Sequence, residues 1–354
     1  MNMEQPIQKY SRAVKRRIVL LIAVTMLLPL AYVVSIAVGA ASVPLHETLA
    51  VLCGTSDEQR FIRIIMDIRL PQTLAAIIAG SGLAVSGATM QAVLRNPLCS
   101  PFTLGISSAA AFGAALMLFV GGGNVMPINN AIAGSSFSSS VIAFGAFLCA
   151  MSTTVAILVF GRFCGSRSET IILIGVALNS LFTAGLMFLQ YLSDDARLAA
   201  IVYWTFGDTA RANWNDLGLM TLCVVPVSFY FLTQSWNYNA LAFGEETAKG
   251  LGVPVRRVRL VTMFLASFLT AILVSLLGII GFVGLVVPHI ARLLVGSDYR
   301  FLLTFSLIFG GLLLLVADTS ARLILAPRVL PVSILMAFIG TPIFLLLLLK
   351  WREA

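Results

Sequence analysis

The sequence has few charged residues. Aspartate, glutamate, lysine and arginine together make up 11% of the 354 positions and 59% are hydrophobic, whereas soluble domains average about 25% charged and about 45–50% apolar residues. A soluble core cannot use that much apolar surface, so the composition excludes an ordinary soluble protein. Because a bilayer span needs about 20 mostly apolar residues, we expect an all-α, polytopic membrane protein whose residues 1–354 form a single transmembrane domain.

Groups that carry enzyme chemistry are also scarce. The five cysteines are scattered without a CxxC pair, so we expect neither a disulfide framework nor a metal site. The two histidines, His46 and His289, have no catalytic partner, and we find no nucleophile with its base and no catalytic pair of carboxylates. It also lacks the GxxxxGK(S/T) phosphate loop of many ATP-binding proteins. We therefore expect no catalytic residue and no cofactor bound by this chain.

Ionisable residues are nearly absent from the apolar runs. A proton- or sodium-driven carrier usually keeps one in mid-membrane, despite an insertion cost of roughly 2.5–3.5 kcal/mol. The clear candidate is Asp318, but Arg322 lies one helical turn further on, where an i,i+4 ion pair can form. We favour local pairing over ion coupling. The lack of a relay indicates that the energy for transport arrives from elsewhere, and an ion-coupled secondary transporter is the more distant alternative.

Ten apolar runs lie between charged, proline or glycine breaks. Only Gly278 to Gly281 separates the seventh run from the eighth, so nine spans remain an alternative. The runs predict helices near 18–40, 71–92, 104–121, 141–160, 171–191, 217–234, 260–278, 282–296, 302–321 and 333–349.

The distribution of lysine and arginine predicts the orientation of these spans. If residues 1–17 form a cytoplasmic N-terminal segment, alternating spans place most basic residues on the cytoplasmic side and both termini in the cytoplasm. The net charge of +8 then reflects topology, and we expect no nucleic-acid partner.

Small residues recur at helical spacing in the second and third runs. Every fourth position from Ala76 to Ala88 is alanine or glycine, and Ala110 and Ala114 repeat the pattern beside Gly113. Since lipid supplies no hydrophobic force between helices, small residues that let two backbones approach are a common basis of packing. We expect close helix contacts along both faces.

The connection after the sixth run, residues 240–257, has the features of a short helix. Glu245 and its acidic neighbour can begin it and Lys249 can end it, in agreement with the helix macrodipole. Two glycines, Gly250 and Gly252, would stop this helix, and Pro254 can start a second short one. We interpret these cytoplasmic helices as a candidate lever for a motor subunit, with an ordinary basic loop as the alternative.

Several ordered motifs, together with residues 240–259, resemble one family closely. It is the FecCD family, the permease subunits of ABC importers for iron-siderophore, haem and vitamin B12. The resemblance runs from about residue 60 to the C-terminus. The motifs are Ile68-Arg-Leu-Pro-Gln-Thr-Leu-Ala75, Ser86-Gly-Ala-Thr-Met-Gln91, Arg95-Asn-Pro-Leu98, Leu104-Gly-Ile-Ser-Ser108, Gly281-Phe-Val-Gly-Leu-Val-Val-Pro-His-Ile-Ala-Arg292, Leu315-Val-Ala-Asp-Thr-Ser-Ala-Arg322, Leu330-Pro-Val-Ser and Gly340-Thr-Pro342.

This resemblance implies the fold and the partners. The fold would be the ten-helix, type II ABC importer permease in the cytoplasmic (inner) membrane. The chain would pair with a second copy or a paralogue, with two cytoplasmic ATPase subunits that bind ATP and magnesium, and with an extracytoplasmic substrate-binding protein. The expected cargo is an iron chelate such as a siderophore complex, and haem, cobalamin or an oxyanion are alternatives within the same importer class.

The resemblance also implies three sets of site residues. Arg69 and Arg322 would face acidic patches on the binding protein. Gln72 stands where the family commonly has a second arginine, so that position offers no cation for docking, and Arg328 or Arg63 could compensate. Contacts with the ATPase would come from Glu245, Ala248, Lys249, Leu251, Gly252, Val253 and Arg257. The translocation pathway, between two permeases, would be lined by Asn179, Phe182, Leu186, Gln190 and Trp204.

Overall fold

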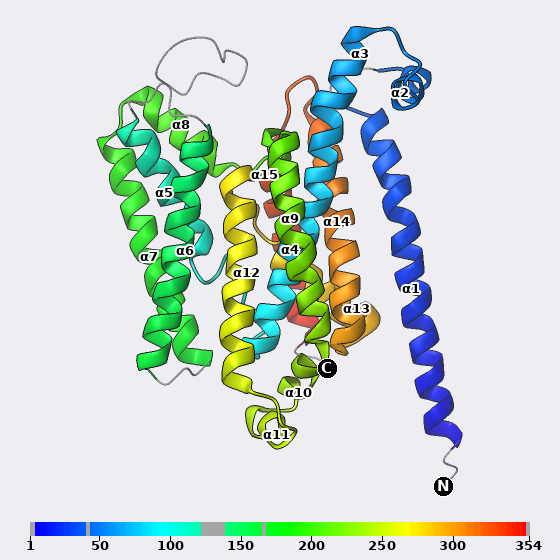
Figure 1. Cartoon of the computed structure of the whole chain (residues 1–354), viewed down its shortest axis with the longest axis vertical. Coiled ribbons are helices and arrows are strands. Elements are labelled where there is room, and N and C mark those ends of the chain that lie inside the picture. The colour runs from blue at the N-terminus through cyan, green and yellow to red at the C-terminus, as the bar shows by residue number, and fades with distance from the viewer. Residues whose placement is uncertain (1–3, 40–42, 122–138, 165–167, 352–354) are drawn as a thin grey trace.

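The computed structural model describes residues 4–39, 43–121, 139–164 and 168–351, and its regular elements there are all helical (Figure 1). Residue 40, the expected end of the first run, and the first three residues of the N-terminal segment lie outside this description. The apolar helices are α1 (Glu4–Ala37), α4 (Leu70–Leu94), α5 (Ile106–Val120), α6 (Ser139–Phe163), α7 (Ser168–Leu192), α9 (Trp214–Thr233), α12 (Val255–Leu277), α13 (Val283–Val295), α14 (Tyr299–Ile324) and α15 (Val332–Trp351).

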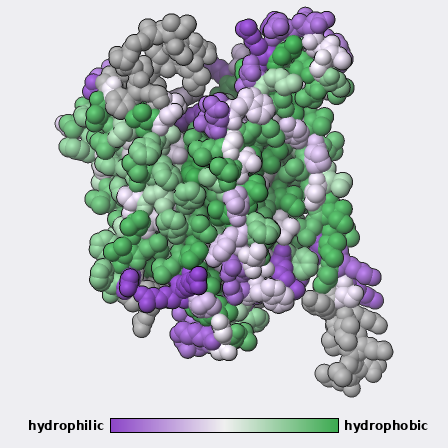
Figure 2. All heavy atoms as spheres, in the orientation of Figure 1, coloured by the Kyte–Doolittle hydropathy of each residue, from purple (hydrophilic) through white to green (hydrophobic). Residues whose placement is uncertain are grey.

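These ten helices coincide with the ten predicted runs. Seven of the helical stretches described are long and apolar enough to cross a bilayer, and α5, α13 and residues 332–346 of α15 are shorter apolar helices. The nine-span alternative is wrong, because the backbone leaves the helix at Gly278 and begins α13 at Val283. Figure 2 shows the apolar surface as a broad belt between two hydrophilic ends, as a multi-pass membrane protein requires.

The helix α4 forms the centre of the bundle. Nearly all of its residues are buried, and it packs against α14, α12, α13 and α9. A Cβ atom added to Gly80 would lie 2.2 Å from the carbonyl oxygen of Gly310 in α14, and one added to Gly87 would lie 1.7 Å from that of Gly284 in α13. The predicted close packing along α4 is therefore confirmed.

The second small-residue face brings α5 against α6. Ala110 and Ala114 are fully buried. A Cβ atom on Gly113 would lie 2.4 Å from the carbonyl oxygen of Gly145. Together with α7, these helices form a group beside the bundle around α4, and α1 lies at the opposite edge against α14 (Figure 1).

The second predicted run begins earlier than expected. A continuous helix runs from Gln59 to Leu94, through α3 (Gln59–Arg63), the π-helical η1 (Ile64–Arg69) and α4. Pro71 lacks an N–H group, and its ring would clash with the carbonyl of Asp67 in a regular α-helix. The wider π turns directly before it accommodate the proline. Reading Pro71 as the start of a helix therefore placed the boundary too late.

Short helices gather at the two ends of the bundle (Figure 1). One end, here the coupling end, carries α10 (Ser235–Ala242) and α11 (Glu245–Gly250), together with the start of α1. The other, here the α3 end, carries α2 (Leu45–Leu52), α3, and α8 (Asp195–Thr205), which the 3-10 turn η2 (Thr209–Arg211) follows along the chain. The N-terminal segment and residues 240–257 thus share one end, in line with the predicted alternation of spans.

The predicted lever differs from the structure in one respect. Helix α11 forms as expected, but Pro254 is the N-terminal boundary of the long helix α12 and begins no separate short helix. Val255, Val258 and Thr262 continue one buried face into the bundle, so the basic run of this segment belongs to the first turns of α12.

Candidate functional site

The helix α11 projects from the coupling end. Gly244 precedes it with φ 117°, and Gly252 follows it with φ 81° in open space, conformations that glycine adopts readily. Lys249 Nζ donates a hydrogen bond to Glu246 at 2.7 Å, and this bond and its opposite charge raise the pKa of the lysine. Both side chains are exposed, so the pair presents charge to solvent.

Most of the residues predicted to contact an ATPase lie together at this helix. Leu251, directly after α11, is 67% exposed. Ala248 is fully buried and anchors α11 instead of facing outward, and Glu245 pairs with Arg259. A groove of about 560 Å³ beside α11 is lined by Lys249, Val253, Pro254, Val255, Arg256, Arg257, Leu260 and Val261.

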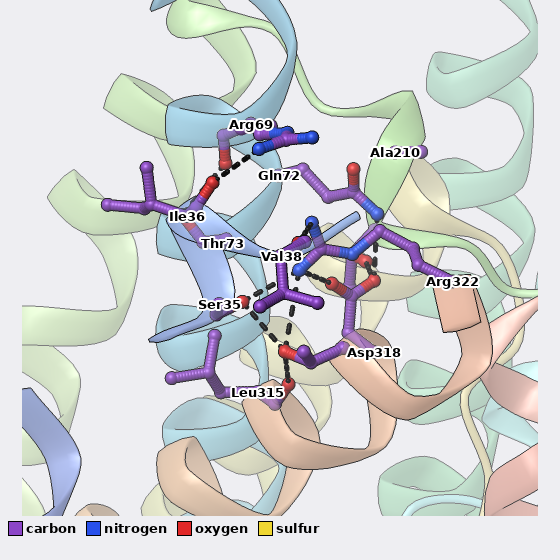
Figure 3. Close-up of polar contacts among 12 residues, drawn as sticks. Ser35, Ile36, Val38, Arg69, Gln72, Thr73, Ala210, Leu315, Asp318 and Arg322 are labelled. Carbon is purple, nitrogen blue, oxygen red and sulfur yellow. Dashed lines mark hydrogen bonds and ion pairs between the residues drawn. The ribbon is translucent and has the colours of Figure 1, made fainter. Parts of the chain in front are cut away.

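A buried polar cluster lies toward the α3 end, where α1, α4, η2 and α14 meet (Figure 3). Asp318 of α14 pairs with Arg322 at 3.1 Å between Oδ2 and Nη2, so the predicted i,i+4 ion pair is confirmed. Gln72 donates its Nε2 to Asp318 Oδ1 at 2.9 Å, and the hydroxyl of Thr209 donates to the same oxygen. The carboxylate is thus held from three elements of the chain.

The two arginines predicted to face a binding protein both belong to this region. Arg69 is 3% exposed and Arg322 is 4% exposed. Arg69 Nη1 donates to the carbonyl oxygens of Ile36 at 2.7 Å and Ala37 at 3.0 Å, and Arg322 Nη2 donates to Ser35 Oγ at 2.7 Å.

The burial of these arginines corrects the expectation that they lie at the surface. The last carbonyls of α1 have no partner within their own helix and carry the negative end of its dipole, so buried cations are favourable there. A docking role for Arg69 and Arg322 stays a prediction, and it would require them to leave these contacts. Arg63 and Arg328, the possible substitutes, are exposed.

The residues predicted to line the pathway lie on α7 and α8. Ser108 donates its hydroxyl to Asn179 Oδ1 at 2.6 Å, and the Phe182 ring lies 5.7 Å from that of Phe112. Both α7 residues therefore face α5 of the same chain. Leu186, Gln190 and Trp204 are half-buried, and their role in a pathway stays a prediction.

The residues that hold these sites together were missed by sequence reasoning. Arg259 lies in a basic run typical of any inner loop, and Thr209 lies in an unremarkable polar connection. No sequence spacing relates either residue to its partner. Among the described residues, no three histidine, cysteine, aspartate or glutamate side chains gather as a metal-ligand set.

Comparison with known proteins assigns the chain to a family. The model of the FecCD transport family matches residues 27–350. The chain belongs to the FecCD transport family. It is therefore a multi-pass membrane protein and the permease subunit of an ABC importer, which works with a partner permease. It is not an enzyme, because a separate ATPase subunit hydrolyses ATP in such transporters.

Individual relatives agree with this assignment over nearly the whole chain. MJ0087 of Methanocaldococcus jannaschii, provisionally named an ABC transporter permease protein, is 48% identical, over 97% of each chain. The hemin transport system permease protein HmuU of Yersinia pestis is 37% identical over 90% of this chain and 93% of its own. A solved structure of an ABC transporter, provisionally of metal-chelate type and in an inward-facing conformation, matches with a TM-score of 0.80 at 33% identity, covering 94% of this chain and 99% of that one.

Proposed function

We propose that this permease carries an iron chelate across the cytoplasmic membrane, in a complex with a second permease, two ATPase subunits and an external binding protein. The observation that carries the proposal is a projecting helix, α11, at one end of a bundle whose own sequence has no ATP-binding loop. Such a chain needs a surface through which a motor subunit can act. The hemin permease and the metal-chelate type transporter among its relatives support the cargo.

The coupling end is proposed to face the cytoplasm. The basic residues of α11 and of the first turn of α12, among them Lys249 and Arg257, lie there, as the bias of cytoplasmic loops toward lysine and arginine favours. ATPase subunits would seat on the groove and on exposed Leu251, and ATP binding would displace α11. The bundle would then alternate access without covalent chemistry in this chain.

The α3 end is proposed to receive the binding protein. Arg63 and Arg328 are exposed and can pair with acidic side chains of that partner, whereas Arg69 and Arg322 are engaged with α1. Charged groups at the rim of an interface mainly steer association and fix its register. The binding protein would select the chelate, and the permeases would provide a wide, mostly apolar route.

An uptake assay tests this function. The permease is reconstituted into vesicles with its ATPase and binding protein, and uptake is compared for a ferric siderophore, ferric haem, cobalamin and molybdate. ATP-dependent uptake of the ferric siderophore that persists with an ionophore supports the proposal. ATP-dependent uptake of ferric haem alone would favour the haem alternative, and ATP-dependent uptake of cobalamin or molybdate alone would retain the importer and reject the iron chelate.

A further inference from the structure

We propose that Arg259 is a positioning residue that ties the coupling helix α11 to the central helix α4, so that a displacement of α11 reaches the bundle. The inference rests on the proposed coupling role of α11. It adds a specific connector between the surface where a motor would push and the helix around which the bundle is built.

The contacts of Arg259 join three helices. The residue lies in the second turn of α12 and is 5% exposed. Its guanidinium forms an ion pair with Glu245, the first residue of α11. Its Nε donates to the carbonyl oxygen of Val93, one residue before the end of α4, at 3.2 Å. One side chain therefore connects the beginning of α11 with the end of α4.

The carbonyl oxygen of Val93 needs a hydrogen-bond donor from outside α4. The last four carbonyls of a helix have no N–H partner in the helix itself. The chain turns at Arg95, where φ is 49°. Two of the four carbonyls find backbone partners in this turn: the N–H of Asn96 donates to Gln91, and the N–H of Arg95 donates to Ala92. Val93 accepts from Arg259 instead, so the end of α4 is completed by a side chain from α12.

The other ion pair of α11 cannot serve as a connector. Lys249 and Glu246 lie three residues apart in the same helix, and their side chains are 56% and 88% exposed. Exposed pairs of this kind contribute little, because water and salt screen them. The Arg259 side chain is 7% exposed and meets a carboxylate from another helix, where losing one partner leaves a charge without compensation.

Helix α4, to which Arg259 is bonded, is rigidly packed. Helix α4 packs backbone to backbone against α14 at Gly80 and against α13 at Gly87, which leaves it little room to deform. Near its other end, Gln72 donates to Asp318 of α14. A displacement of α11 that acts on Val93 through the Arg259 guanidinium would therefore move α4 together with its neighbours.

Three variants separate this role from mere stability. Arg259→Gln removes the charge and the guanidinium that contacts Glu245 and Val93. Glu245→Gln removes the carboxylate charge on α11 and leaves the hydrogen bond from Arg259 to Val93 in place. Arg259→Lys keeps the charge but not the planar fork that spans two acceptors. Arg162→Gln is the matched control, because Arg162 is an exposed arginine in the last turn of α6. The main readout is the number of substrate molecules imported per ATP hydrolysed by the reconstituted importer.

We expect Arg259→Gln and Glu245→Gln to lower this ratio by about 2- to 30-fold, the range seen when a coupling network is mutated. Arg259→Lys should lie between them and the wild type, and Arg162→Gln should not change the ratio. Amide hydrogen exchange in α11 of the isolated, detergent-solubilised permease should become faster in Arg259→Gln and Glu245→Gln and should not change in Arg162→Gln. This second readout needs no transport, so it tests the tether even if the wild-type complex imports nothing.

Two outcomes would overturn the inference. One is a wild-type import ratio in folded Arg259→Gln and Glu245→Gln proteins. The other is unchanged exchange in α11 in both variants. If Arg259→Gln does not fold, Glu245→Gln decides the question, since it retains the bond to Val93.

Discussion

The ion pair between Asp318 and Arg322 gives a quantitative prediction. Replacing Asp318 with asparagine keeps an oxygen that can accept from Gln72 and Thr209, but it leaves the Arg322 cation, 4% exposed, facing neutral partners such as Ser35. Removing one partner of a buried ion pair typically costs about 3–5 kcal/mol. We expect Asp318→Asn to lower the free energy of unfolding by that amount.

A double-mutant cycle isolates the electrostatic part. Arg322→Gln should destabilise as well, and the variant carrying both changes should lose less than the sum of the single losses, with a coupling energy of about 2–3 kcal/mol. Unfolding by sodium dodecyl sulfate in mixed micelles, followed by circular dichroism, provides the free energies. Arg328→Gln is the control, and because Arg328 is exposed its effect should stay within about 0.5 kcal/mol.

The reasoning is refuted if Asp318→Asn costs less than about 1 kcal/mol or if the two single effects simply add. The same variant bears on the ion-coupled alternative. If it abolished uptake at full stability, Asp318 would be a coupling group and not a structural one.

Three further predictions follow from the packing and the exposed charges. Gly87→Ala should lower the free energy of unfolding by about 1–3 kcal/mol, because the new Cβ would lie 1.7 Å from the backbone oxygen of Gly284. Gly218→Ala is the control: nothing lies within 4 Å of its new Cβ, so it should raise the free energy of unfolding by up to about 1 kcal/mol in the same assay. Lys249→Glu should leave membrane insertion intact and uncouple ATP hydrolysis from import, and a wild-type import ratio would count against the coupling surface. Arg328→Glu should weaken association with the binding protein in a pull-down, and unchanged binding would remove this residue from the docking proposal.

Hydropathy was sufficient to locate the membrane helices. Ten apolar runs became ten helices, and even the brief interval from Gly278 to Gly281 separates two of them, because glycine and the left-handed Phe282 let the chain leave one helix and begin another. The short helix α11 was also predictable, since its acidic start and basic end follow the helix dipole. Each of these features depends on neighbours in the sequence.

Features that depend on distant partners were not predictable. The segment around Arg69 reads as an outer connection, and only the fold brings the end of α1 against it, so that the buried Arg69 donates to the last carbonyls of that helix. Arg259 lies 14 residues after Glu245, in the next helix, and 166 residues after Val93. The π turns before Pro71 have no sequence signature beyond the proline itself, which also fits an ordinary helix start.

The most direct test of the account is the energy source for import. Vesicles containing the permease, its ATPase and its binding protein are loaded with ATP and treated with an ionophore that collapses ion gradients. The account predicts that uptake of a ferric siderophore continues, and that it stops without ATP or without the ATPase. Uptake by this chain alone, driven by an ion gradient, would contradict it.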